Sequence, residues 1–239
     1  MKKTHIVQRP SPEDVAMAAR DWFVERCRQS IVERGRCIAA LSGGSTPKRL
    51  YELLSELNDG DIDWPKVHLF WGDERDVSAN HADSNYRMVK ESLLDRLTTS
   101  KPLVYRIPTG NQSTDRAARE YELIMREFTG GGPFYFDIVL LGLGEDAHTA
   151  SLFPETMALS ITDRWAVANQ VEKLSTMRVT LTAPVLNSSQ NVAFLVCGES
   201  KQWAIDKIRG PHRNPRLYPA QLIQPIGDLW WFVDSAIKI

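Results

Sequence analysis

The sequence predicts an α/β fold in which a mainly parallel sheet is covered by helices on both faces. The main observation is a set of short apolar runs, CIAAL, VHLFW, FDIVLL and VAFLVC, which lack the polar alternation of half-exposed strands. A second observation is that segments with helical periodicity alternate with strand patterns along the chain. Strands that are apolar on both faces need cover on both faces, as in parallel sheets connected by helices. Ligands of such sheets bind beyond the carboxyl ends of the strands.

The expected elements follow in chain order. Ser11, Pro12 and two acidic residues predict the start of a first helix, whose apolar stripe ends at Gly35. After it we expect a strand at 37–41, a helix around 50–57, a strand at 67–71, helices around 86–97 and 117–128, strands at 136–141, 165–169, 178–182 and 192–197, a helix at 199–208 and a last strand at 229–234. No internal repeat or convincing linker interrupts the pattern, so a single domain over residues 1–239 is expected.

Composition argues against several function classes. The net charge is −1 and the basic residues are scattered, which gives no support to nucleic-acid binding. No apolar run of about 18 residues is present, and the start MKKTHIVQRP lacks the apolar stretch of a signal peptide. Cys27, Cys37 and Cys197 show no metal-ligand spacing, so reduced thiols are expected. These features predict a cytoplasmic protein without nucleic-acid or membrane partners. We also expect a monomer or weak homo-oligomer, which these features do not decide.

The first polar strand end is SGGSTP, residues 42–47. Gly43 and Gly44 allow backbone amides to approach an anion, and Ser45 or Thr46 is placed to cap the helix that follows. A helix N-terminus provides free N–H groups and a partial positive charge, which suits a phosphate. The same residues are equally typical of a well-capped helix without a ligand. The stretch is not a Walker loop, because G-x-x-x-x-G-K-[ST] is absent.

The second polar strand end is WGDERDV, where Asp73, Glu74, Arg75 and Asp76 follow an apolar strand. A carboxylate and a guanidinium at this position can orient a polyol and stabilise developing negative charge. The alternative is an exposed turn with a local ion pair.

The third polar strand end is LLGLGEDAHTASLFP, residues 140–154. Gly142, Gly144 and Ala147 match G-x-G-x-x-[GA], a weak indication of a dinucleotide site. The match lies in the middle of the chain, two acids occupy the turn, and Pro154 interrupts the short helical pattern that follows. A dinucleotide site is therefore poorly supported.

His148 is the more informative residue of this stretch. Of the five histidines, only His148 follows a strand end with an acid, Asp146, two residues before it. Such an acid can fix the tautomer of the ring and raise its basicity, as an Asp does for a catalytic His. A structural histidine that caps TASLF is the alternative. Arg178 and Lys201 also lie near ends of late strands, but each alone is typical of a solvated surface charge.

Taken together, these stretches resemble the 6-phosphogluconolactonase family, within the wider group of glucosamine-6-phosphate isomerase/deaminase-like proteins. The matching pieces are LSGGSTP, WGDER, HADSNYRM, LLGLGEDAHTASLFP, RVTLT and CGESK, in family order over roughly residues 38 to 201. Each piece is moderately specific, and the ordered set is a strong resemblance.

The resemblance implies a modified Rossmann-like fold and hydrolysis of 6-phospho-D-glucono-1,5-lactone to 6-phosphogluconate in the oxidative pentose phosphate pathway, without a cofactor or metal. It implies that Asp73 and Arg75 line the sugar site and that His148 is the base, with Asp146 near it. The residues that it assigns to the substrate phosphate are Ser42, Gly43, Gly44, Ser45, Thr46, Arg178 and Lys201.

The chain departs from the family pattern at one position. The family usually has Gly where this chain has Ala147, between Asp146 and His148. A positive φ there would cost about 1 kcal/mol or more for alanine and could shift the histidine.

Two rival functions are weaker. The sister deaminase activity has a glutamate before the proline of this loop, where this chain has Phe153, and a phenylalanine cannot shuttle the protons that opening an amino-sugar ring requires. A non-catalytic sugar-phosphate sensor of a transcription regulator would carry a DNA-binding segment, for which the chain has no room before its first helix.

Overall fold

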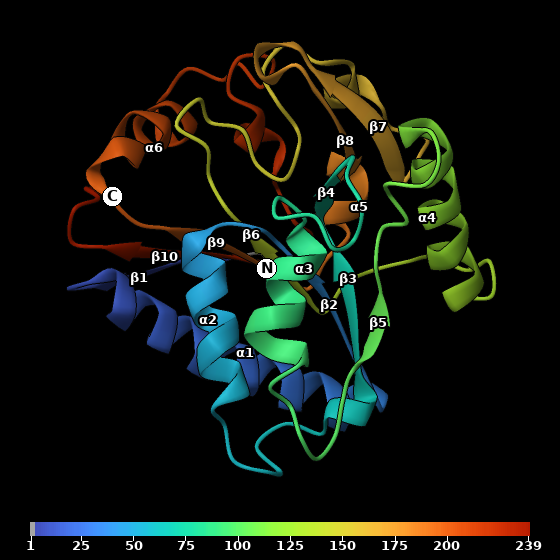
Figure 1. Ribbon diagram of the computed structural model, residues 1–239. Coiled ribbons are helices and arrows are strands. Elements are labelled where there is room, and N and C mark those ends of the chain that lie inside the picture. Colours follow the sequence, from blue (N-terminus) through green and yellow to red (C-terminus); the bar gives the residue numbers. More distant parts are fainter. Residues whose placement is uncertain (1–2) are drawn as a thin grey trace.

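The computed structural model describes residues 3–239. Its largest element is a parallel sheet with the strand order β1-β10-β9-β6-β2-β3-β5 (Figure 1). Its strands are β1 (Thr4–Arg9), β2 (Cys37–Leu41), β3 (Val67–Trp71), β5 (Leu103–Tyr105), β6 (Ile138–Leu141), β9 (Asn191–Val196) and β10 (Asp228–Asp234). The central strands β2 and β6 are buried along their whole length, as in sheets covered on both faces. The predicted α/β class is confirmed.

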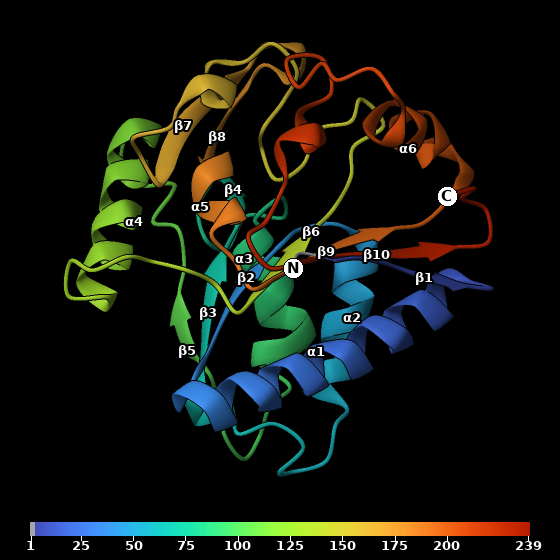
Figure 2. The same ribbon diagram turned by 180° about the vertical axis from the view of Figure 1, so that it is seen from behind.

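Helices cover both faces of this sheet. Figures 1 and 2 show α1, α2 and α3 on one side and α6 on the other. The α-helices are α1 (Pro12–Arg34), α2 (Ser45–Ser55), α3 (Asn85–Val89), α4 (Thr114–Phe128), α5 (Ala183–Asn187) and α6 (Gln202–Arg209). A π-helical turn, Lys90–Leu94, continues α3. Short 3-10 turns occur at Trp64–Lys66, Met157–Ser160, Glu172–Leu174, Glu199–Lys201 and Pro219–Leu222.

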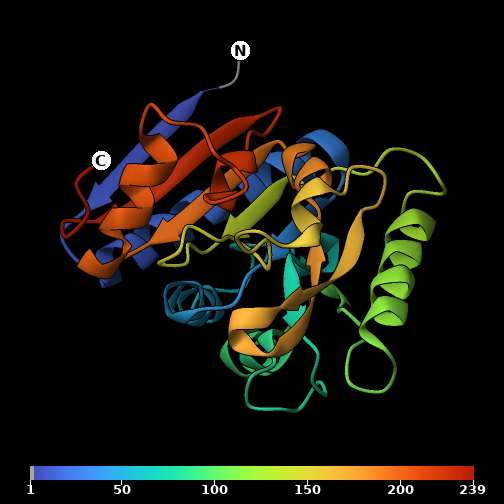
Figure 3. The ribbon, with the colours of Figure 1, turned by 90° about the horizontal axis from the view of Figure 1, so that it is seen from above.

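A second, antiparallel sheet was not predicted. It has the order β4-β8-β7 and consists of β4 (Asp73–Arg75), β8 (Thr176–Leu181) and β7 (Ala166–Val171). The expectation that the strands around 165–169 and 178–182 extend the parallel sheet is wrong, because a connection as short as residues 172–175 permits only antiparallel pairing. In Figure 3 this sheet lies beside the larger one, and α4 flanks it.

Three further local expectations need correction. The edge strands β1 and β5 were not predicted, since β1 is only partly buried and β5 is very short. The pattern after His148 is not a helix: residues 149–154 form turns and a single bridge between Thr149 and Leu152. The predicted cap of α2 is also wrong, because its N-cap is Gly44 and no side chain makes the capping hydrogen bond.

The ends of α1 agree with the sequence. The Ser11 hydroxyl accepts a hydrogen bond from the Asp14 amide at 3.2 Å, which caps the helix. Gly35 ends it in the left-handed conformation with φ 73°. Cys27 and Cys37 are buried free thiols, and Cys197 is a half-buried one.

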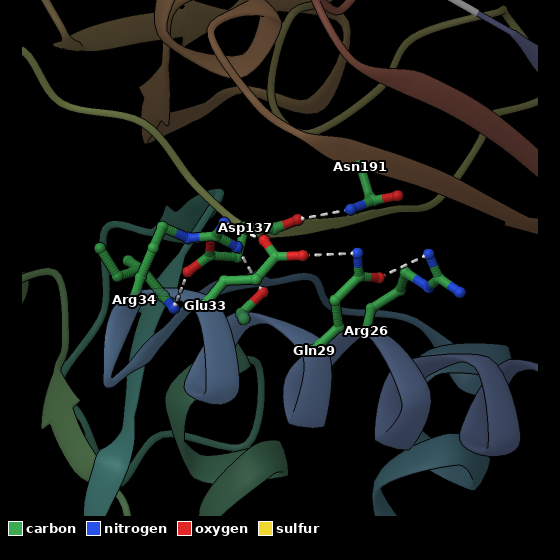
Figure 4. A network of polar contacts seen from close by, with 8 residues as sticks. Arg26, Gln29, Glu33, Arg34, Asp137 and Asn191 are labelled. Carbon is green, nitrogen blue, oxygen red and sulfur yellow. Dashed lines mark hydrogen bonds and ion pairs between the residues drawn. The ribbon is translucent and has the colours of Figure 1, made fainter.

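The amino ends of the central strands are held by a buried carboxylate, that of Asp137 (Figure 4). It accepts hydrogen bonds from Arg34 Nε at 3.0 Å and from the Ile38 amide at 2.7 Å, and Asn191 Nδ2 donates to the Asp137 carbonyl at 3.1 Å. Burial raises the pKa of Asp137 in spite of these donors. The network joins the end of α1 to β2, β6 and β9 at the edge opposite to the polar strand ends.

Among residues 3–239, no helix has the length and apolar character needed to cross a membrane.

Candidate active site

The polar strand ends converge on one pocket of about 220 Å³, beyond the carboxyl ends of β2, β3 and β6. Its walls are formed by Ser42, Gly43, Gly44, Asp73, Arg75, Asn85, Gly142, Leu143, Gly144, His148, Thr149, Ala150, Arg178 and Lys201. Most of the predicted site residues therefore lie together. Ser45, Thr46 and Asp146 do not line this pocket.

The glycine loop after β2 forms one wall. The Tyr51 hydroxyl accepts a hydrogen bond from the Ser42 amide at 3.0 Å and donates one to the Ser42 carbonyl at 2.9 Å, which fixes the backbone of the loop. A side chain at Gly43 would overlap the buried amide of Asn85 and force it to move, which favours glycine there. The Ser42 hydroxyl is buried and has no hydrogen-bond partner within residues 3–239. Such a group is available to a ligand.

Three cationic side chains also line the pocket. Arg75 on β4 and Arg178 on β8 are directly paired in the antiparallel register. Arg75 donates to the Asp83 carbonyl at 2.5 Å, while its buried Nε has no partner in the described chain. Burial and the charge of Arg75 lower the pKa of Arg178. With Lys201, whose nearest carboxylate is that of Glu145 at 3.9 Å, these groups make the pocket attractive to an anion.

Asp73 lines the same pocket as these cations and is 6% exposed. Its carboxylate accepts a hydrogen bond from Ser151 Oγ at 2.6 Å, and Asn85 Nδ2 donates to its carbonyl at 3.0 Å. Neither Ser151 nor Asn85 was predicted as a site residue. Both lie inside the quoted motifs, but their role depends on tertiary contacts that a sequence pattern does not reveal.

Glu74, the neighbour of Asp73, has a structural role and does not line the pocket. Its buried carboxylate accepts hydrogen bonds from the amides of Asn85 and Tyr86, each at 2.8 Å, and so fastens the start of α3 to β4. Burial raises the pKa of Glu74 despite these donors. The alternative reading of this stretch as an exposed turn is wrong.

His148 and Asp146 form a close pair. Nδ1 of His148 lies 2.5 Å from Oδ1 of Asp146, and the His148 amide donates to the same oxygen at 3.2 Å. The other Asp146 oxygen makes an ion pair with Lys173. With Nδ1 engaged, Nε2 is the nitrogen left to exchange a proton with a ligand. Asp146 itself lines a neighbouring cavity and acts on the pocket through the ring.

Burial lowers the pKa of His148 to about 4, from its usual value near 6.5. The carboxylate of Asp73 opposes this shift, whereas the positive charges of Lys201, Arg178 and Arg75 add to it. The lowered pKa leaves the imidazole neutral at pH 7. A neutral imidazole held at Nδ1 can accept a proton from water, which is the requirement for a general base.

Ala147 adopts the positive φ that the sequence comparison anticipated. Its φ is 63° and its side chain is completely buried. The alanine nevertheless holds Asp146 and His148 in contact, so the departure from the family glycine does not separate the pair.

The dinucleotide reading of this loop is wrong. No helix begins in residues 149–156, so the amide groups that would hold a pyrophosphate are not presented. Gly144 has another role: a side chain there would overlap the His148 ring. Within residues 3–239, no three His, Cys, Asp or Glu side chains come together as a metal site.

Comparison with known proteins points to a single family. The family model described as glucosamine-6-phosphate isomerases/6-phosphogluconolactonase matches residues 10–231. A protein of Synechocystis sp. named 6-phosphogluconolactonase is 43% identical over 213 residues, which cover 88% of this chain and 87% of that protein. One of Nostoc sp. with the same name is 39% identical over 241 residues, covering 99% and 97% of the two chains.

Solved structures agree with this result. The crystal structure of a 6-phosphogluconolactonase from Shewanella baltica has a TM-score of 0.86 and 28% identity, covering 98% of this chain and 99% of that one. A 6-phosphogluconolactonase from Trypanosoma cruzi has a TM-score of 0.85 and 28% identity, covering 99% and 96%. The chain belongs to the glucosamine-6-phosphate isomerase/6-phosphogluconolactonase family.

Proposed function

We propose that this protein hydrolyses 6-phospho-D-glucono-1,5-lactone to 6-phospho-D-gluconate, the lactonase step of the oxidative pentose phosphate pathway. The names of its relatives support this substrate. The observation that carries the proposal is a neutral histidine, His148, in the same small pocket as three cationic side chains. A base and an anion site within one pocket suit a phosphorylated substrate that water attacks.

In the proposed mechanism, His148 acts first as a base. Its Nε2 takes a proton from water as the water oxygen bonds to C1 of the lactone, and the carbonyl electrons move to the oxygen. When the carbonyl re-forms, the bond from C1 to the ring oxygen breaks, and the imidazolium returns its proton to that oxygen. Asp146 holds Nδ1 and stabilises the transient charge on the ring. A lactone carbonyl is already electrophilic, so the mechanism needs no covalent nucleophile.

The phosphate is assigned to the glycine loop and to two cations. Gly43, Gly44 and Ser42, whose hydroxyl has no partner within residues 3–239, line the same pocket as Arg178 and Lys201. Charge-assisted hydrogen bonds of this kind contribute about 1.5–3 kcal/mol each. Because they form far from the reacting carbon, they serve mainly to position the ring.

The other predicted site residues are assigned to the sugar, to the oxyanion or to support of the phosphate loop. Asp73 is assigned to the sugar, and Arg75 or loop amides hold the oxyanion. Ser45 and Thr46 support the phosphate loop from the first turn of α2. We further propose a monomer or weak homo-oligomer and a cytoplasmic location, and the free thiols of the chain support the location.

The sister deaminase activity is not favoured. The position that would need a glutamate is Phe153, whose ring stacks on His148. No carboxylate from this position is available to shuttle protons at the ring.

The proposal is tested by adding the purified chain to freshly made 6-phosphogluconolactone and following acid release, against the spontaneous rate without enzyme. We expect acceleration by the native chain and a kcat about 10²- to 10⁴-fold lower for His148→Ala, with little change in KM. His212→Ala, an exposed histidine, is the matched control. Acceleration that survives His148→Ala would keep the activity and discard the base. The absence of acceleration by the native chain would discard the activity.

A further inference from the structure

The His148 ring rests against an aromatic partner that the mechanism above does not use. Phe153 is stacked on it, with ring centroids 3.9 Å apart and an angle of 20° between the planes. Only 3% of Phe153 is exposed. The chain returns to His148 within five residues because Ala150 also has a positive φ, 47°, and Leu152 bridges back to Thr149.

Phe153 separates two cavities. His148 lines the pocket of about 220 Å³, to which Phe153 does not contribute. Phe153 lines a larger neighbouring cavity of about 730 Å³, to which His148 does not contribute. On the side of the larger cavity, Lys173 Nζ lies 5.4 Å from the centre of the phenyl ring. The phenyl ring thus stands between His148 and a cavity large enough to admit many water molecules.

The charges around His148 act on its protonation in both directions. Asp146 contacts the ring, and Asp73 on β4 favours its protonation. The cations Arg75, Arg178 and Lys201 oppose protonation, but a bound phosphate would neutralise much of their effect. Exclusion of water is the remaining contribution, and it is the largest cause of the lowered pKa.

We propose that Phe153 is a positioning residue for lactone hydrolysis, a wall that orients the His148 imidazole and keeps the water of the larger cavity away from it. The proposal rests on the function proposed above. It gives a chemical reason for an apolar ring at this position: a carboxylate here would favour the imidazolium, which cannot accept a proton from water. A phenyl ring favours the neutral base.

The test compares Phe153→Ala and Phe153→Gln, which remove the wall, with Phe153→Leu, which keeps an apolar side chain. The matched control is Phe128→Ala, since Phe128 packs edge-on against His68, away from the pocket. Two readouts are needed: the NMR titration of the His148 ring protons, assigned with His148→Gln, and the pH profile of kcat/KM. Circular dichroism confirms that each variant is folded.

We expect the titration midpoint of His148 to rise toward 6.5 in Phe153→Ala and Phe153→Gln. At pH 5 the neutral fraction, and with it kcat/KM relative to pH 7, would then fall by up to about 30-fold. Phe153→Leu should restore most of the native profile, and Phe128→Ala should leave His148 unchanged. Ionisation of the substrate phosphate affects all variants alike.

Two results would overturn the proposal: a native His148 that titrates near 6.5, or folded Phe153→Ala and Phe153→Gln proteins with the native midpoint. Because the NMR titration needs no turnover, it decides the role of Phe153 at His148 even if the chain fails to hydrolyse the lactone. Failure of hydrolysis would discard the proposed function alone.

Discussion

Arg75 and Arg178 lie opposite each other on neighbouring antiparallel strands, so that two positive charges share one wall of the pocket. Like charges placed directly opposite in a ladder destabilise a sheet by up to about 1 kcal/mol. The lowered pKa of Arg178 reflects the same repulsion together with burial. Binding of the substrate phosphate to Arg178 should therefore offset part of this repulsion and stabilise the protein.

Replacement of Arg178 by glutamine should have opposite effects on stability and on binding. Relief of the repulsion should raise the free energy of unfolding of the free protein by about 0.2–1 kcal/mol, measured by urea denaturation. The loss of a charge-assisted contact should raise KM about 10- to 100-fold with kcat nearly unchanged. Arg213→Gln, at an exposed arginine, should change neither quantity. A variant that is less stable than the native chain would contradict the repulsion argument.

The stability of the protein should depend on pH through His148. Its folded pKa, about 4, is lower than its unfolded value near 6.5, so the unfolded chain binds the proton first as the pH falls. The stabilising contribution is complete above pH 6.5 and is lost as the pH falls toward 4. It amounts to about 2 kcal/mol between pH 7 and pH 5. Urea denaturation at the two pH values should therefore show a smaller difference for His148→Gln than for the native chain, whereas His212→Gln should behave as native.

Ala147→Gly tests the cost of the positive φ in the histidine loop. Glycine has no steric penalty at φ 63°, so the replacement should stabilise the protein by up to about 1 kcal/mol. The lost packing energy of one buried methyl group reduces this gain. Ser175→Gly serves as the reference, because Ser175 has a similar φ of 49° on an exposed turn. We expect the thermal midpoint to rise more for Ser175→Gly. A large loss of kcat in Ala147→Gly would mean that the alanine itself holds the loop in place.

Gly144→Ala should damage catalysis, since the added methyl group would overlap the His148 ring and approach the Asp146 carboxylate. The ring must move to accommodate it, and a displacement of about 1 Å can cost about 100-fold in rate. Gly132→Ala, remote from the pocket and with ordinary space around its Cα, is the control. Steady-state kinetics of both variants should show the loss in kcat of Gly144→Ala only. Native kcat in that variant would show that the loop can shift without consequence.

The parallel core was predictable from the sequence because its strands are apolar on both faces. The placement of β7 and β8 in a separate antiparallel sheet was not predictable, because both strands contain apolar and polar residues. Their pairing is decided by the short turn between them. The edge strands β1 and β5 carry too little burial to leave a pattern. The sequence therefore indicated the fold class but not the second sheet.

The site was predictable where it follows parallel strands, because their carboxyl ends must meet. Asp73, Arg75 and His148 belong to this group. Arg178 and Lys201 became candidates only through the family resemblance, since Arg178 lies within β8 of the antiparallel sheet and Lys201 follows β9 of the parallel one. The capping role expected of Ser45 or Thr46 failed because Gly44, with φ 106°, takes the N-cap position.

Contacts made only in the folded chain could not be predicted. Ser151 reaches Asp73 from 78 residues away, and Asn85 reaches it from 12 residues away. In the sequence, Phe153 stands out only because it occupies the position where the sister deaminases have a glutamate. Its stacking on His148 depends on the positive φ angles of Ala147 and Ala150. Alanine rarely adopts this conformation, so the sequence does not predict it.

The buried carboxylate of Asp137 lies at the amino ends of the strands whose carboxyl ends carry the pocket. A strand as long as β6 keeps the two about 13 Å apart, and rigid backbone separates them. Stability and catalysis thus depend on residues at opposite ends of the same sheet. Mutations around Asp137 should therefore change the amount of folded protein in the cell rather than its catalytic rate. Substitutions at this end of the sheet can raise thermal stability without lowering that rate.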